Sequence, residues 1–141
     1  MGIWDRWIAV VKKEDKRINL GFQVADVKKP LIAVKRITEK GNRVSFGPNA
    51  GDNYIANDKT GDKLMLRPNG RGSYLMDVSF LGGKRTEITV DSGAEENVCP
   101  RDWGSEFPMR DVTRKMRFRG ASGEMIAHHG QRDVVVTADS F

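Results

Sequence analysis

Short runs of alternating apolar and polar residues recur along this sequence, and glycine, proline, asparagine or aspartate ends almost every one. Such alternation places apolar side chains on one face of an extended strand, whereas an amphipathic helix repeats with a period near 3.6 residues. The residues that end the runs are those that form tight turns. The sequence therefore predicts a mainly β chain of eight to ten short strands with one or two short helices.

The strands fall into groups along the chain. The run "GFQVADV" alternates with Phe22 and Val24 inward, and Pro30 closes it. Residues 47–87 predict a β-meander, because "DNYIAND", "DKLMLRP" and "GSYLMDVSF" are separated by the turn sequences "KTGD" and "PNGRG". A further group of strands is expected in "RKMRFR", "EMIAHHG" and "RDVVVTA", with the turn "GASG" between the first two.

One short helix is expected after Leu31. In "LIAVKRITEKGNRVSF" the apolar residues Val34 and Ile37 share a helical face, and Gly41 stands where a helix C-cap prefers glycine. A strand with Val44 should follow it. For residues 1–20, periodicity does not decide between a strand pair and a short helix.

The length and composition of the chain fit one globular domain. The chain has 141 residues, of which 38% are hydrophobic and 30% charged, enough for a single core near the size at which a partner surface often completes it. No apolar run approaches the roughly 20 residues of a membrane helix, and the first residues lack a signal-peptide core, so we expect a soluble, cytoplasmic protein. The basic residues behind the net charge of +5 are scattered, which permits nucleic-acid contact without favouring it.

Neither a metal site nor a cofactor is predicted. His128 and His129 are adjacent, so on a strand they point to opposite faces and cannot hold one metal together. Cys99 is the only cysteine, and the chain has no HExxH or CxxC sequence. Cys99 is expected to be a small buried residue.

The stretch "ITVDSGAEENVCP" ends an apolar strand on Asp91 and continues with Ser-Gly-Ala. An aspartate in this position can expose its carboxylate at the floor of a cleft. Gly93 would allow a tight turn and a close approach by substrate, while the hydroxyl of Ser92 would lock the loop. Taken alone, "DSG" is more typical of an ordinary Asx-turn at a strand end, because Asp, Ser and Gly are all common turn formers.

The surroundings of this tripeptide resemble the retropepsins, the aspartic proteases of retroviruses and LTR retrotransposons. Their pattern of an apolar strand, Asp-Thr/Ser-Gly-Ala and one or two acids is similar to Val90 through Glu96. The glycine-rich hairpin that closes over substrate in that family, the flap, is similar to "FRGASGEMIAHHG", with Gly120, Ala121, Ser122 and Gly123 at its tip. The resemblance implies a retropepsin-like acid-protease barrel with one short helix.

The order of the parts differs from the family. The segment similar to the family's C-terminal half, residues 21–46, precedes the catalytic loop, so the order is circularly permuted. The expected organisation is one aspartic-protease-like domain over residues 1–141: an N-terminal segment (1–20), the family's C-terminal half (21–46), a connecting β-meander (47–87), and the half with catalytic loop and flap (88–141). Ala33 stands where the family usually has glycine, so the backbone there must avoid a positive φ.

The resemblance also implies a homodimer. Peptide hydrolysis by carboxylates needs two of them around one water, and this chain has a single Asp-Ser/Thr-Gly, so two Asp91 side chains would meet across a two-fold axis. The expected activity is an endopeptidase that processes a mobile-element polyprotein. Ser92 and Gly93 would support the catalytic loop, and the residues expected to bind peptide substrate are Gly93, Ala94, Glu95, Glu96, Met125 and Ile126.

The alternative is a non-catalytic β-domain, an assembly module of such a polyprotein that touches nucleic acid through its basic surface. Residues 47–80 suit this alternative because they carry no catalytic signature. Cleavage inhibited by a transition-state mimic would favour the protease, whereas tight, strongly salt-dependent RNA binding without cleavage would favour the module.

Overall fold

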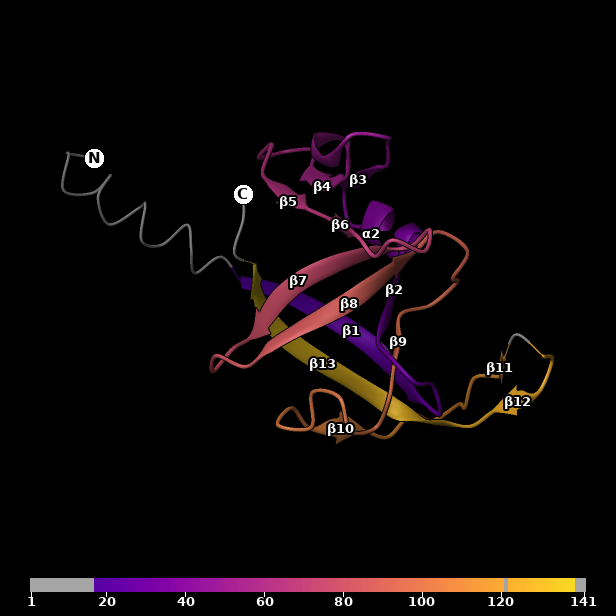
Figure 1. Cartoon of the computed structure of the whole chain (residues 1–141). Coiled ribbons are helices and arrows are strands. Elements are labelled where there is room, and N and C mark those ends of the chain that lie inside the picture. Colours follow the sequence, from indigo (N-terminus) through magenta and orange to yellow (C-terminus); the bar gives the residue numbers. More distant parts are fainter. Residues whose placement is uncertain (1–16, 121, 139–141) are drawn as a thin grey trace.

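The computed structural model of the protein describes residues 17–120 and 122–138. Over these ranges the fold is mainly β, with one α-helix, α2 (Val34–Glu39), and one turn of 3-10 helix at Ala50–Asp52 (Figure 1). The strands are β1 (Arg17–Ala25), β2 (Leu31–Ala33), β3 (Asn42–Ser45), β4 (Tyr54–Asn57), β5 (Lys63–Met65), β6 (Arg67–Pro68), β7 (Tyr74–Phe80), β8 (Arg85–Asp91), β9 (Val98–Cys99), β10 (Met109–Arg110), β11 (Phe118–Arg119), β12 (Met125–Ile126) and β13 (His128–Ala138).

The largest sheet has the strand order β10-β13-β1-β9-β2-β8-β7-β6. Strand β7 also pairs with β13, Phe80 opposite Val136, so the strands from β13 through β1, β9, β2 and β8 to β7 form a closed ring. In Figure 1, β7 and β8 lie across the long antiparallel pair β1 and β13. Closure removes two edges that would otherwise expose unpaired backbone groups.

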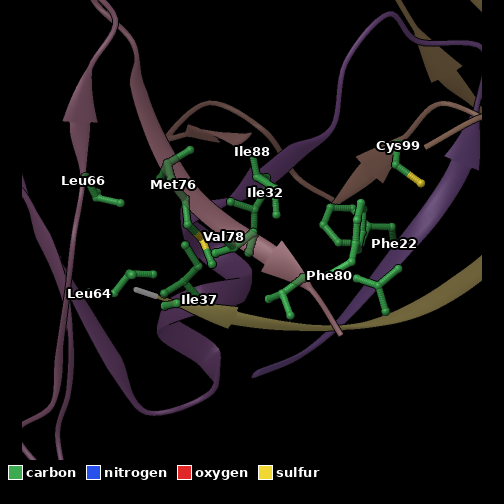
Figure 2. Packing of buried hydrophobic residues seen from close by; sticks show 14 of the residues in the cluster. Phe22, Ile32, Ile37, Leu64, Leu66, Met76, Val78, Phe80, Ile88 and Cys99 are labelled. Carbon is green, nitrogen blue, oxygen red and sulfur yellow. The ribbon is translucent and has the colours of Figure 1, made fainter. Parts of the chain in front are cut away.

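The core lies inside this ring. Strand β13 alternates between buried and more exposed positions along most of its length, as expected for a strand with one face toward the core. The inward positions predicted for Phe22 and Val24 are confirmed, since both are fully buried. Figure 2 shows the side chains that fill the interior; the labelled ones are Phe22, Ile32, Ile37, Leu64, Leu66, Met76, Val78, Phe80, Ile88 and Cys99.

The helix begins and ends where the sequence predicts. Ala33, at the N-cap position, has φ −80°, so the backbone avoids a positive φ as expected for a residue with a side chain. Ile37 faces the core, and the helix gives way to Gly41 with φ 84°, a conformation that favours glycine. Strand β3 follows directly.

The single β-meander predicted for residues 47–87 is wrong, because its strands belong to two sheets. Strands β3, β4 and β5 form a separate three-stranded sheet, whereas β6 and β7 belong to the eight-stranded sheet, β7 within the closed ring and β6 at the edge beside it. The predicted strand "DKLMLRP" divides at Leu66, whose side chain is buried and whose N–H donates to Asn53 O at 2.9 Å. The apolar contact of Leu66 with the core turns the chain from one sheet to the other.

The number of strands was also underestimated. The described residues contain thirteen strands, because several connections make brief two-residue pairings such as β9, β10 and β11. Runs this short leave no periodic signal. In the loop after Pro100, Trp103 contacts Phe22 and Phe80 at ring distances of 4.9 and 5.0 Å.

Two further predictions concern the conformation of residues 1–20 and whether any helix could span a membrane. Of the N-terminal segment 1–20, residues 1–16 lie outside the described residues, and residues 17–20 belong to β1. Among the described residues, none of the helices has the length and apolar character needed to span a bilayer.

Candidate active site

Asp91 is the last residue of β8 and lies at the edge of the core. Ile88 and Val90 before it are buried, while Asp91 itself is half-buried. The neighbouring strand β2 runs parallel to β8, with Ala33 opposite Asp91. The chain thus carries a carboxylate out of a buried strand to the point where the strand meets solvent, as the sequence predicts.

The loop after Asp91 is closed by the carboxylate itself. The Gly93 N–H donates to Asp91 Oδ1 at 2.8 Å, which is the hydrogen bond of an Asx-turn. An ordinary Asx-turn and a catalytic loop would both contain this bond, so it does not distinguish the two interpretations of "DSG". The turn forms as expected, although it does not itself demand glycine: the φ of Gly93 is not positive, and a Cβ there would lie 3.5 Å from Asp91 Oδ1, an ordinary contact.

Asn97 ties the far end of the loop to two strands. Its Oδ1 accepts from the Ala33 N–H at 2.8 Å, and its Nδ2 donates to Gly21 O at 3.0 Å. One amide side chain therefore links the loop to the end of β2 and to β1. Asn97 was not among the predicted site residues, and its place in a run of polar residues gave no signal of this role.

The two acids after Ala94 pair with the first turn of α2. Glu96 accepts a hydrogen bond from the Arg36 guanidinium, and Glu95 Oε2 lies 3.6 Å from Lys35 Nζ. The hydrogen bonds from Arg36 to Glu96 and Glu39 raise the pKa of the guanidinium. These two side chains thus hold the loop against the helix. Ser92 is exposed and Ala94 is half-buried.

A cleft of about 370 Å³ opens beside Asp91. Strands β7 and β8 supply one wall, and the segment leading into β2 supplies another. Tyr74 stands opposite Val90 in the β7–β8 ladder and contacts Phe46 at a ring distance of 4.5 Å. The lining residues are Lys29, Leu31, Phe46, Gly72, Ser73, Tyr74, Thr89, Val90, Asp91 and Ser92.

Several members of this lining were missed from the sequence. Phe46 and Tyr74 lie 28 positions apart and face one cleft only because β3 and β7 meet near the end of β8, which no local pattern reveals. None of the six residues predicted to bind substrate is among the described residues that line this cleft: Gly93, Ala94, Glu95, Glu96, Met125 and Ile126. All six remain predicted substrate contacts.

The predicted flap is a hairpin. Strands β11 and β12 pair with Phe118 opposite Ile126, and the Gly120 N–H donates to Glu124 O at 2.9 Å across the turn. Gly123 has φ 83°, so this turn requires glycine there. Ser122 and Met125 are exposed, and Ala121 lies outside the described residues. Within residues 17–120 and 122–138, no hydrogen bond or ion pair joins the hairpin to the loop of residues 91–97.

His128 anchors the base of this hairpin. Its Nδ1 accepts from the Met116 N–H at 2.8 Å, so the ring proton sits on Nε2, which lies 2.9 Å from Gln23 Oε1. Its ring also meets Phe118 edge to face at 5.4 Å. His129 points to the other side and contacts Asp26 Oδ1 at 2.6 Å, a hydrogen bond that lowers the pKa of Asp26.

Two other kinds of functional group are relevant in the part of the chain that the structure describes: metal-binding clusters and the Cys99 thiol. This part of the chain contains no cluster of three His, Cys, Asp or Glu side chains suited to a metal ion. Cys99 is fully buried, as predicted, and burial raises the pKa of its thiol to about 12.

Comparisons with known proteins gave no relative. No model of a known family matches the chain, and neither a curated protein nor a solved structure matches it. The functional argument therefore depends on the residues around Asp91.

Proposed function

We propose that this protein is an aspartic endopeptidase of retropepsin type. The observation that carries the proposal is the position of Asp91, whose carboxylate ends a buried strand, is held by the Gly93 N–H and opens onto a cleft of about 370 Å³. A carboxylate fixed at the wall of a cleft large enough for substrate side chains can act on a bound peptide.

One carboxylate cannot perform this hydrolysis alone. The ionised member of a pair takes a proton from water, whose oxygen attacks the peptide carbonyl carbon, while the protonated member donates to the carbonyl oxygen. Collapse of the tetrahedral intermediate breaks the C–N bond, and the amine leaves with a proton. The sequence holds a single Asp-Ser/Thr-Gly, so the second carboxylate is Asp91 of another copy in a two-fold dimer.

The strand arrangement supports a permuted retropepsin-like barrel. Strand β2 lies parallel beside the catalytic strand β8, and β9, which follows the loop, lies between β2 and β1. Arg17 at the start of β1 pairs with Thr137 near the end of β13. The ends of these two strands stand opposite each other, as they would if a direct hairpin joined them in the family's usual order.

The decisive test is substitution of the carboxylate. We expect Asp91→Asn to abolish cleavage of a peptide library and of a polyprotein substrate, because the amide cannot serve as the base. Asp102→Asn is the matched control, since Asp102 is an exposed aspartate outside the cleft. Cleavage should also be blocked by a statine-type transition-state mimic. Equal cleavage by Asp91→Asn and the unaltered protein would contradict the proposal.

A second candidate function, nucleic-acid contact, is favoured by one observation. The segment that leads into the hairpin carries four exposed basic side chains, those of Arg114, Lys115, Arg117 and Arg119. Phosphate contacts by such residues give binding that weakens steeply with salt. Tight RNA binding of this kind by a protein with no Asp91-dependent cleavage would favour this function over the protease.

A further inference from the structure

We propose that Lys29 makes the cleft beside Asp91 selective for an acidic side chain, glutamate above all, next to the bond that is cleaved. This inference rests on the proposed peptidase function and adds a substrate class to it. It follows from the position of Lys29, the charges of the cleft and the shape of its walls.

Lys29 is placed by the strand that lies beside the catalytic one. The Thr89 N–H donates to Pro30 O at 3.2 Å, and Leu31 is opposite Thr89, so the segment leading into β2 follows β8 toward Asp91. Lys29 and Leu31, on either side of Pro30, both line the same cleft as Asp91.

Among the described residues that line the cleft, Lys29 is the only cation and Asp91 is the only acid. Lys29 is exposed, and within the described part of the chain no carboxylate lies at ion-pair distance from it. An acidic substrate side chain would therefore find an ammonium group available, whereas a basic one would meet a like charge. Complementary charge of this kind discriminates between partners more than it raises overall affinity.

The walls explain why glutamate should be preferred to aspartate. Leu31 and Val90 are aliphatic, and Tyr74 packs on Phe46, so the cleft offers apolar surface before the ammonium is reached. A lysine covers such surface with its methylene stem and keeps its charge at the edge. The two methylenes of glutamate suit these walls, and its carboxylate can reach the rim.

The experiment compares cleavage profiles within each enzyme, so that a change in overall rate does not matter. Peptides that differ only in Glu, Gln or Lys beside the scissile bond are digested at pH 6, where the glutamate is ionised. The unaltered protein should cleave the Glu peptide about tenfold faster than the Gln peptide and disfavour Lys. Lys29→Met should remove the difference, and Lys29→Glu should reverse it toward Lys.

Lys28 supplies the matched control, since it is an exposed lysine next in sequence that does not line the cleft. Lys28→Glu should leave the profile unchanged. A profile that is the same in Lys29→Glu and in the unaltered protein would overturn this inference while leaving the peptidase intact. Absence of any Asp91-dependent cleavage would instead overturn the proposed function, and this inference with it.

Discussion

Gly93 has room for a side chain in the single chain. Its φ is not positive, and an added Cβ would meet nothing closer than Asp91 Oδ1 at 3.5 Å. Its fold does not require glycine there, so we propose that the glycine, two residues after Asp91, serves the close approach of another group. In a dimeric peptidase the approaching group is the substrate backbone or the partner loop.

We therefore expect Gly93→Ala to separate stability from activity. The free energy of unfolding of the single chain should change by less than about 0.5 kcal/mol, as for substitutions that meet no strain. Cleavage should fall by at least about tenfold, which corresponds to about 1.4 kcal/mol of lost transition-state stabilisation. Chemical denaturation and peptide hydrolysis measured on the same preparation test this. Unchanged cleavage would show that nothing approaches Gly93.

Cys99 lies fully buried in β9, and burial raises the pKa of its thiol from 9.0 to about 12. The folded state thus favours the protonated thiol. This contribution to stability is fully present below pH 9 and is lost as pH rises from 9 toward 12, where the unfolded chain ionises first. We expect a thiol reagent at pH 8 to modify Cys99 only as fast as the protein opens. Rapid modification of the native protein, at the rate seen in denaturant, would contradict this burial.

The loop after β8 depends on its connection to two other strands. Asn97 accepts from the Ala33 N–H and donates to Gly21 O, so it couples the middle of β1 and the end of β2 to the loop that holds Asp91. Asn97→Ala should cost about 1 to 3 kcal/mol in unfolding free energy, because it leaves a partly buried N–H without an acceptor.

Asn97→Asp is the informative comparison. It keeps an acceptor for the Ala33 N–H, but it loses the donor to Gly21 O and turns a carboxylate oxygen toward that carbonyl. Because a charged acceptor strengthens the bond from the Ala33 N–H, we expect it to be less destabilised than Asn97→Ala. Equal losses for the two variants, measured by denaturant unfolding, would mean that the bond to Ala33 contributes little.

Most strands and the helix could be predicted from the sequence, because they depend on local patterns. The alternation around Phe22 and Val24 and the glycine at position 41 each express a local rule, and the structure follows them. The division of "DKLMLRP" at Leu66 could not be predicted, since it depends on a contact between the Leu66 side chain and a distant core. For the same reason the position of Asp91 at a strand end could be predicted from the sequence, whereas the roles of Asn97, Phe46 and Tyr74 could not.

The closed ring of strands is a property of long-range pairing. Strands β1 and β13 are separated by more than 100 residues yet form the longest ladder, and β7 closes the ring against β13. Nothing within a short window of sequence encodes these partners. The resemblance around Asp91 suggested a barrel, and the strand order is compatible with a permuted form of it.

In the proposed dimer, two Asp91 carboxylates from two chains act on one water. The most direct measurement mixes the unaltered protein with Asp91→Asn in varying proportion, after unfolding and refolding together, at constant total concentration. If both carboxylates are needed, mixed dimers are inactive, and activity falls with the square of the unaltered fraction, to about one quarter at equal amounts. Activity that falls in direct proportion, to about one half, would show that each chain works alone and would contradict the claim.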